Sequence, residues 1–125
     1  MTAEAAGAAQ PGFTVIFCTG THCRSHLPVR EMLGTTVRGC PHGMSVGTAC
    51  LSGLTGCHGD ASPGPLLLVQ RCTGTDRRPS GPTRVLGPLR SHRDLAMVCR
   101  WLADPDTDLP LRLDPAARRA AAARN

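Results

Sequence analysis

The stretch FTVIFCTGTHC, residues 13–23, constrains this chain most strongly. Its first five residues are β-branched or aromatic, which predicts a strand over residues 13–17. The apolar run ends at Cys18, and a short segment of Thr, Gly and His leads to Cys23. Two thiols in a loop of small residues directly after a strand favour a pair of ligands over two ordinary buried cysteines.

The size of the chain and its cysteine content indicate where such a pair would be used. The protein has 125 residues, seven of them cysteine, and 2% are aromatic, so one domain with a small core is expected. Residues 1–12 lack the features of a secretory signal, and no segment is apolar enough to cross a bilayer. We therefore predict a cytoplasmic protein that does not bind membranes. Cysteines stay reduced there, which indicates metal or redox chemistry rather than disulfides.

The charge of the chain favours protein partners over nucleic acid. All fourteen basic residues are arginine, and the net charge is +5. The arginines are scattered, and no aromatic surface for stacking bases lies among them, so we predict no nucleic-acid partner. A mildly basic surface suits an acidic protein.

Hydrophobic periodicity predicts two α-helices and four strands. Strands are expected at residues 13–17, 44–50, 66–70 and 83–87, and the unbroken apolar run of the third predicts burial on both faces. A helix is expected to start near Pro28 and end at Gly39, and a second to span residues 91–103 with Ser91 and Asp94 as a capping box. The expected apolar faces are Val29, Met32, Leu33 and Val37 on the first helix, and Leu95, Val98, Cys99 and Leu102 on the second.

This order, β-α-β followed by β-β-α, is that of the core of the thioredoxin fold. We therefore predict an α/β protein with a single thioredoxin-like domain over residues 13–103. Residues 1–12 are expected to form a disordered leader, and residues 104–125 a Pro/Asp-rich and Ala/Arg-rich tail whose end can form a short helix.

A second pair of cysteines consists of Cys50, the last residue of the second expected strand, and Cys57 in the loop after it. In a thioredoxin-like sheet the loops after the first two strands can lie side by side. Four thiolates would then meet at one edge of the domain, and thiolates suit zinc or an iron–sulfur cluster.

Two stretches, VIFCTGTHCR (15–24) and TACLSGLTGC…GPLLLVQ (48–70), resemble the thioredoxin-like [2Fe-2S] ferredoxins. That family is related to the thioredoxin-fold subunit of NADH:quinone oxidoreductase. The resemblance implies a [2Fe-2S] cluster held by Cys18, Cys23, Cys50 and Cys57. It also implies an electron carrier rather than an enzyme, working between a reductase and an acceptor oxidoreductase. Arg24 and Arg71 are expected near the cluster to steer acidic partners.

One departure from the family leaves the fourth ligand open. The family separates its second pair by three residues, whereas six residues separate Cys50 from Cys57. The substitutes to consider are Cys40, His42, His58 and Cys72, and His22 and His26 also lie close to cysteines. Two alternatives follow: a zinc- or copper-binding module that uses cysteines and histidines, and a degenerate ferredoxin fold without a cluster that acts as an accessory protein. A thiol oxidoreductase is disfavoured because the sequence has no C-x-x-C motif.

Overall fold

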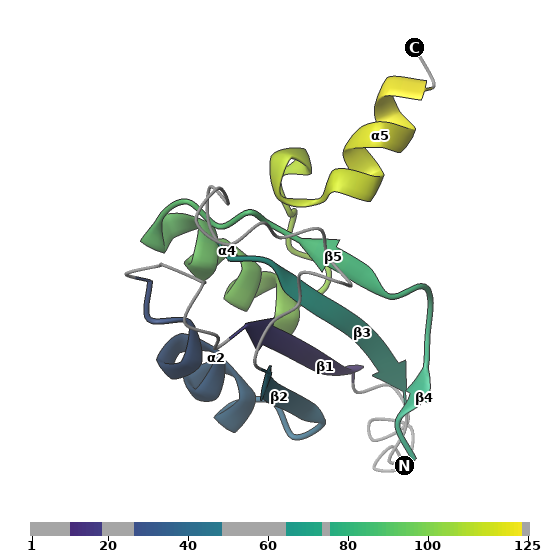
Figure 1. Ribbon diagram of the computed structural model, residues 1–125. Helices are drawn as coiled ribbons and strands as arrows, with labels where there is room; N and C mark the ends of the chain where they lie inside the picture. The colour runs from purple at the N-terminus through teal and green to yellow at the C-terminus, as the bar shows by residue number, and fades with distance from the viewer. Residues whose placement is uncertain (1–10, 19–26, 49–64, 74–75, 124–125) are drawn as a thin grey trace.

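A computed structural model of the chain describes residues 11–18, 27–48, 65–73 and 76–123. They form a mixed α/β protein with one five-stranded mixed sheet (Figure 1). Along the chain the elements are β1 (Pro11–Cys18), α2 (Val29–Arg38), β2 (Gly43–Thr48), β3 (Leu67–Thr73), β4 (Arg78–Pro79), β5 (Arg84–Leu86), α4 (His92–Ala103), the 3-10 turn η2 (Leu111–Leu113) and α5 (Pro115–Ala123). No helix within these residues is long and apolar enough to cross a bilayer.

The sheet has the strand order β2-β1-β3-β4, and β5 also pairs with β3. Strands β1 and β2 are parallel, and α2 forms the crossover that parallel neighbours need. Strand β3 is antiparallel to β1, and β4 and β5 are antiparallel to β3. The predicted succession of strands and helices is confirmed. The two-residue strand β4 was missed because it falls in an expected turn and shows no apolar alternation.

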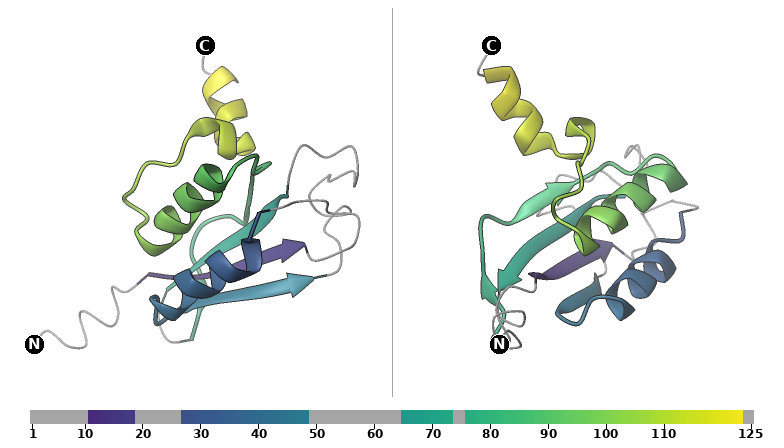
Figure 2. Two further views of the ribbon diagram at one scale, coloured as in Figure 1. Left: turned by 90° about the vertical axis from the view of Figure 1, so that its left-hand side faces the viewer. Right: turned by 180° about the vertical axis from the view of Figure 1, so that it is seen from behind.

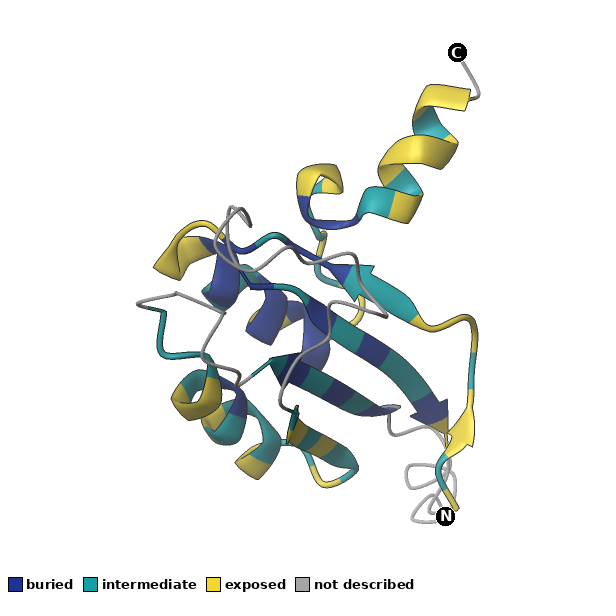
Figure 3. Ribbon diagram, in the orientation of Figure 1, coloured by how far each residue is buried: buried dark blue, intermediate teal, exposed yellow. Residues whose placement is uncertain are grey.

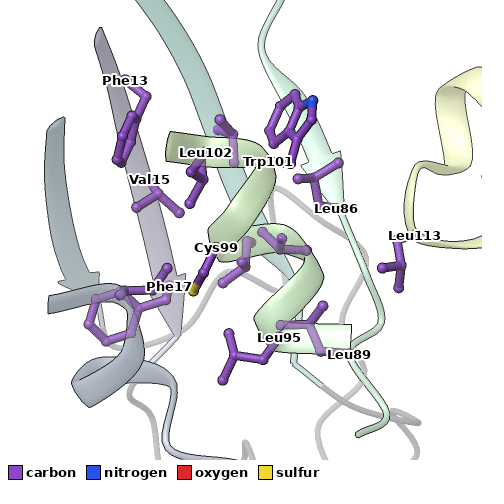
Figure 4. Close-up of a cluster of buried hydrophobic side chains, with 14 residues drawn as sticks. Phe13, Val15, Phe17, Leu86, Leu89, Leu95, Cys99, Trp101, Leu102 and Leu113 are labelled. Atoms are coloured by element: carbon purple, nitrogen blue, oxygen red, sulfur yellow. The ribbon is translucent and has the colours of Figure 1, made fainter. Parts of the chain in front are cut away.

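The core lies on one face of the sheet (Figure 4). Phe13, Val15 and Phe17 of β1 are buried, and so are Leu67 and Val69 of β3. Seen from behind in Figure 2, α2 and α4 lie together over this face. The prediction that residues 66–70 are buried on both faces was wrong, since the residues of β3 that alternate with the buried ones are only partly covered (Figure 3).

Both predicted helices form at the expected places. On α2, Leu33 is buried, and Val29, Met32 and Val37 pack against the core. The predicted apolar face of α4 is buried in full, together with Trp101.

The predicted capping box of α4 forms in part. The Ser91 hydroxyl accepts a hydrogen bond from the Asp94 N–H at 3.1 Å. The Asp94 carboxylate accepts a hydrogen bond at 2.9 Å from the N–H of Arg90, one residue before Ser91, whose backbone N–H is the donor in a complete capping box.

The chain beyond residue 103, predicted as a tail, packs on the domain. Leu113 is fully buried, and its carbonyl accepts a hydrogen bond from the Gly87 N–H at 2.9 Å. Ion pairs join Arg112 to Asp94 and Arg84 to Asp114. The short helix expected in the Ala/Arg segment is α5, which has no buried residue. The segment up to Asp114 therefore belongs to the same folded unit as the sheet.

The other end of the domain also differs from the prediction. Strand β1 begins at Pro11, so two residues assigned to the leader belong to the sheet. Gly12 is buried, and a Cβ atom there would lie 2.9 Å from the carbonyl oxygen of His42. This close approach explains why a glycine stands there, whereas residues 1–10 lie outside the described part.

Candidate metal-binding edge of the sheet

Cys18 is the last residue of β1, and its partner in the parallel strand β2 is Thr48, the last residue of that strand. The two strands therefore end at the same edge of the sheet, which we call the Cys18 edge. Strand β3 starts at this edge too, because Leu67 pairs with Phe17. The other predicted ligands lie in segments 19–26 and 49–64. These segments directly follow β1 and β2 in the sequence, so both begin at the end of one of two neighbouring strands.

Of the four predicted ligands, Cys18 lies in the described part of the chain, where it is partly buried. The other three, Cys23, Cys50 and Cys57, lie outside the described residues, as do His22, His26 and His58. Cys50 stands two residues after Thr48 in the sequence. Because Cys18 pairs with Thr48, the two cysteine-containing segments begin at neighbouring positions in the sheet.

The described substitute ligands lie at the opposite end of the sheet. His42 precedes β2, and its carbonyl accepts hydrogen bonds from the Phe13 N–H at 3.1 Å and from Arg77 at 2.9 Å. Phe13 is five residues before Cys18 on β1, a separation of about 16 Å along a strand. The structure therefore does not bring His42 to the Cys18 edge.

Two further cysteines share that distant position. Cys40 lies between α2 and β2, where its N–H donates to the Val37 carbonyl at 3.0 Å. Cys72 is buried on β3 opposite Gly12. Neither thiol is near the Cys18 edge, so both are poor substitutes for a fourth ligand.

The environments of two thiols also oppose ionisation. Burial raises the pKa of the Cys40 thiol, and the nearby charge of Arg71 opposes this in part. Burial likewise raises the pKa of the Cys99 thiol, and a hydrogen bond with Thr36 opposes this rise in part. Cys99 is a core residue of α4, as predicted (Figure 4). Within residues 11–18, 27–48, 65–73 and 76–123, no three His, Cys, Asp or Glu side chains gather in a way that could hold a metal.

Arg71 does not lie beside Cys18, where it was expected. It pairs with Phe13 at the other end of β1, and its guanidinium donates to the carbonyls of Trp101 at 2.7 Å and Leu102 at 2.9 Å. It also lies 4.3 Å above the Trp101 ring. The guanidinium is also 5.8 Å from the centroid of the Phe13 ring, so it contacts both the end of α4 and the start of β1. Arg24 is outside the described residues.

No protein-family model matches the chain, and neither do curated proteins or solved structures. The site is therefore argued from its residues and from the topology that positions them. A thiol at the end of a parallel strand pair can serve as a soft metal ligand.

The sequence analysis did not identify Arg30, an arginine that does lie at this edge. The guanidinium of Arg30, in the first turn of α2, is 5.4 Å from the centroid of the Phe17 ring, next to Cys18 in the chain. No sequence signal marked Arg30, since its position depends on where α2 starts relative to the end of β1.

Proposed function

We propose that this protein is a small [2Fe-2S] electron carrier with a thioredoxin-like fold. The observation that carries the proposal is the parallel register in which Cys18 pairs with Thr48. Cys18 ends β1 and Cys23 follows it in the sequence, while Cys50 and Cys57 follow β2. Parallel neighbours end at one edge, so two pairs far apart in the sequence start next to each other, as a four-thiolate site requires.

The sheet arrangement supports the same proposal. The helix α2 connects two parallel strands, antiparallel strands follow, and α2 and α4 cover one face. This is the arrangement we would expect of a thioredoxin-like domain. The sequence resemblance to the thioredoxin-like ferredoxins covers the same elements.

In this proposal Cys18, Cys23, Cys50 and Cys57 hold the cluster, and the protein is not an enzyme. A [2Fe-2S] cluster supplies one-electron transfer, and the chain supplies thiolate ligands, partial burial and a surface for partners. The partners are a reductase that gives electrons and an oxidoreductase that accepts them. The distant positions of Cys40, His42 and Cys72 leave Cys57 as the preferred fourth ligand, with His22, His26 and His58 as alternatives.

The first experiment is anaerobic purification of the full chain, followed by a visible spectrum and assays of iron, acid-labile sulfide, zinc and copper. We expect a coloured protein with about two irons and two sulfides per chain. A colourless protein that contains zinc or copper would instead support a Cys/His metal-binding module. A colourless, metal-free protein that stays folded after attempted reconstitution would support a degenerate ferredoxin fold.

A pair of substitutions tests the ligand assignment. Cys18→Ser removes the thiol at the Cys18 edge, and we expect it to abolish the visible chromophore. Cys40→Ser is the matched control, because it removes a partly buried thiol at the opposite end of the sheet. We expect this variant to keep its iron, sulfide and colour. Full colour in Cys18→Ser, or loss of colour in a folded Cys40→Ser protein, would contradict the assignment.

A further inference from the structure

Two helices begin at the Cys18 edge and place exposed arginines there. Helix α2 starts at Val29, and the exposed Arg30 in its first turn lies over the ring of Phe17. In Figure 1 both α2 and α4 start on the left-hand side of the molecule. The first turn of α2 therefore lies beside the end of β1.

The first turn of α4 lies at the same edge. The N–H of Leu89 donates to the Pro65 carbonyl at 2.9 Å, just before β3 begins opposite Phe17. Arg90 and Arg93 follow directly, and both are exposed. Arginines in or directly before the first turns of both helices thus lie at the edge where β1 ends with Cys18.

Few acidic groups offset these charges. Glu31 is the exposed acid among the described residues of these two first turns. Asp94 is 2% exposed and accepts hydrogen bonds from Arg112 at 2.6 Å and from the Arg90 N–H. The negative charge of Asp94 is therefore compensated by its ion pair with Arg112. The Arg30, Arg90 and Arg93 group stays net positive.

The opposite edge of the domain differs. Its exposed charges are mixed: Arg38, Arg78 and Arg100 stand with Asp76, Asp104 and Asp106. Arg78 and Asp76 form an ion pair of 2.9 Å. Among the described residues, exposed arginines without a matching acid lie at the Cys18 edge and on α5, where Arg118 and Arg119 are exposed as well.

We propose that the Cys18 edge is a docking surface for an acidic patch on a partner protein, and that Arg30, Arg90 and Arg93 make the contact. Charges of one sign around a site steer oppositely charged partners to it and raise association rates at low salt. That this partner exchanges electrons rests on the proposed function. A protein is favoured over nucleic acid because no Phe, Tyr or Trp is exposed among the described residues of these helix ends, so the large aromatic rings on which bases usually stack are absent there.

The test on the coloured protein uses two small oxidants of opposite charge. Hexacyanoferrate(III) or hexaamminecobalt(III) takes one electron from the reduced protein, so the protein is oxidised and the metal complex is reduced by one unit. Stopped-flow rates are measured at low and high ionic strength. For the wild type we expect the rate of oxidation by the anionic complex to fall as salt is added, and the rate of oxidation by the cationic complex to rise.

Two triple variants separate local from net charge. In R30Q/R90Q/R93Q we expect the anionic oxidant to react about fivefold more slowly at low salt, and the cationic oxidant faster. R38Q/R78Q/R100Q removes the same charge from the opposite edge, and we expect less than about a twofold change. Equal effects of the two triple variants would show that net charge alone governs the rate and would overturn the proposal.

A second measurement does not depend on a cluster. In a colourless protein, the paramagnetic anion hexacyanochromate(III) is titrated into 15N-labelled full-length chain. We expect line broadening of the amides around Arg30 and around residues 90–93, and loss of this broadening in R30Q/R90Q/R93Q. Broadening centred elsewhere would overturn the docking surface, whereas a missing chromophore would overturn only the electron carrier. If a DNA duplex bound saturably to the wild type but not to the same triple variant, the partner of this surface would be a nucleic acid and not an acidic protein.

Discussion

The guanidinium of Arg71 closes the C-terminal end of α4. The last carbonyls of a helix lack partners within the helix, and Arg71 donates to two of them, those of Trp101 and Leu102. Its charge also lies near the negative end of the helix dipole and over an aromatic face. Burial lowers the pKa of Arg71, and the charge of Arg84 lowers it further. A residue that the sequence placed near a redox site is thus a link between β3 and α4.

Replacement of Arg71 by Gln should destabilise the protein. We expect the free energy of unfolding to fall by about 2 kcal/mol, since two charge-assisted hydrogen bonds to helix carbonyls are lost. Urea titration followed by fluorescence measures this, and the emission reports directly on the site because Trp101 is the single tryptophan. Arg100→Gln, at an exposed position on the same helix, is the control and should change stability by less than about 0.5 kcal/mol. Equal stability of the two variants would contradict the role assigned to Arg71.

At the scale of elements, Asp94 joins the start of α4 to η2. Its buried carboxylate accepts from Arg112 of η2 and from the N–H of Arg90. The hydrogen bond with Arg112 is the main cause that lowers the pKa of Asp94 below its ordinary value of 3.8, against the opposing effect of burial. The folded chain therefore holds this carboxylate in its charged form.

This pKa shift predicts how stability depends on pH. Because the pKa of Asp94 is lower in the folded chain, its contribution is complete well above pH 3.8 and is lost as the pH falls through the folded value. Asp94→Asn should be less stable than the wild type at pH 7, and the difference should narrow in acid. Urea titrations at a series of pH values measure it, with the exposed Asp108→Asn as the control. If the difference in unfolding free energy between the wild type and Asp94→Asn stayed constant down to the lowest pH, the charged form of Asp94 would not be what stabilises the fold.

At the scale of the whole molecule, the domain extends past α4. After α4, Leu109 packs against the core and Leu113 is buried in it (Figure 4). Ion pairs at Arg112 and Asp114 join the same segment to the domain. The apolar core therefore includes a residue from a segment whose composition predicted a tail.

Two leucines in one turn test this extension. Leu113→Ala removes a fully buried side chain and should cost about 3 kcal/mol of unfolding free energy. Leu111 is 52% exposed in the same 3-10 turn, so Leu111→Ala should cost less than about 1 kcal/mol. Thermal or urea denaturation measures both. If Leu113→Ala were as stable as Leu111→Ala, the segment would not be part of the cooperative fold.

Local patterns in the sequence predicted most of the secondary structure. The β-branched run at 13–17 became β1, and the 3.6-residue periodicity of 91–103 became α4 with its expected buried face. Such patterns work because a strand or an amphipathic helix is set by neighbouring residues. They could not predict that one face of β3 stays partly open, since that depends on both helices packing against the same side of the sheet.

The sequence by itself determined the four longer strands, the helices α2 and α4 with their apolar faces, and the cysteine that ends β1. The tertiary structure alone decided which distant groups meet. The register of β1 and β2 put Thr48 beside Cys18 and left Cys40 and His42 at the far end. The same packing turned Arg71 inward and placed Arg30 at the Cys18 edge. Local propensity acts over a few residues, whereas register and helix placement are fixed by contacts between segments far apart in the chain.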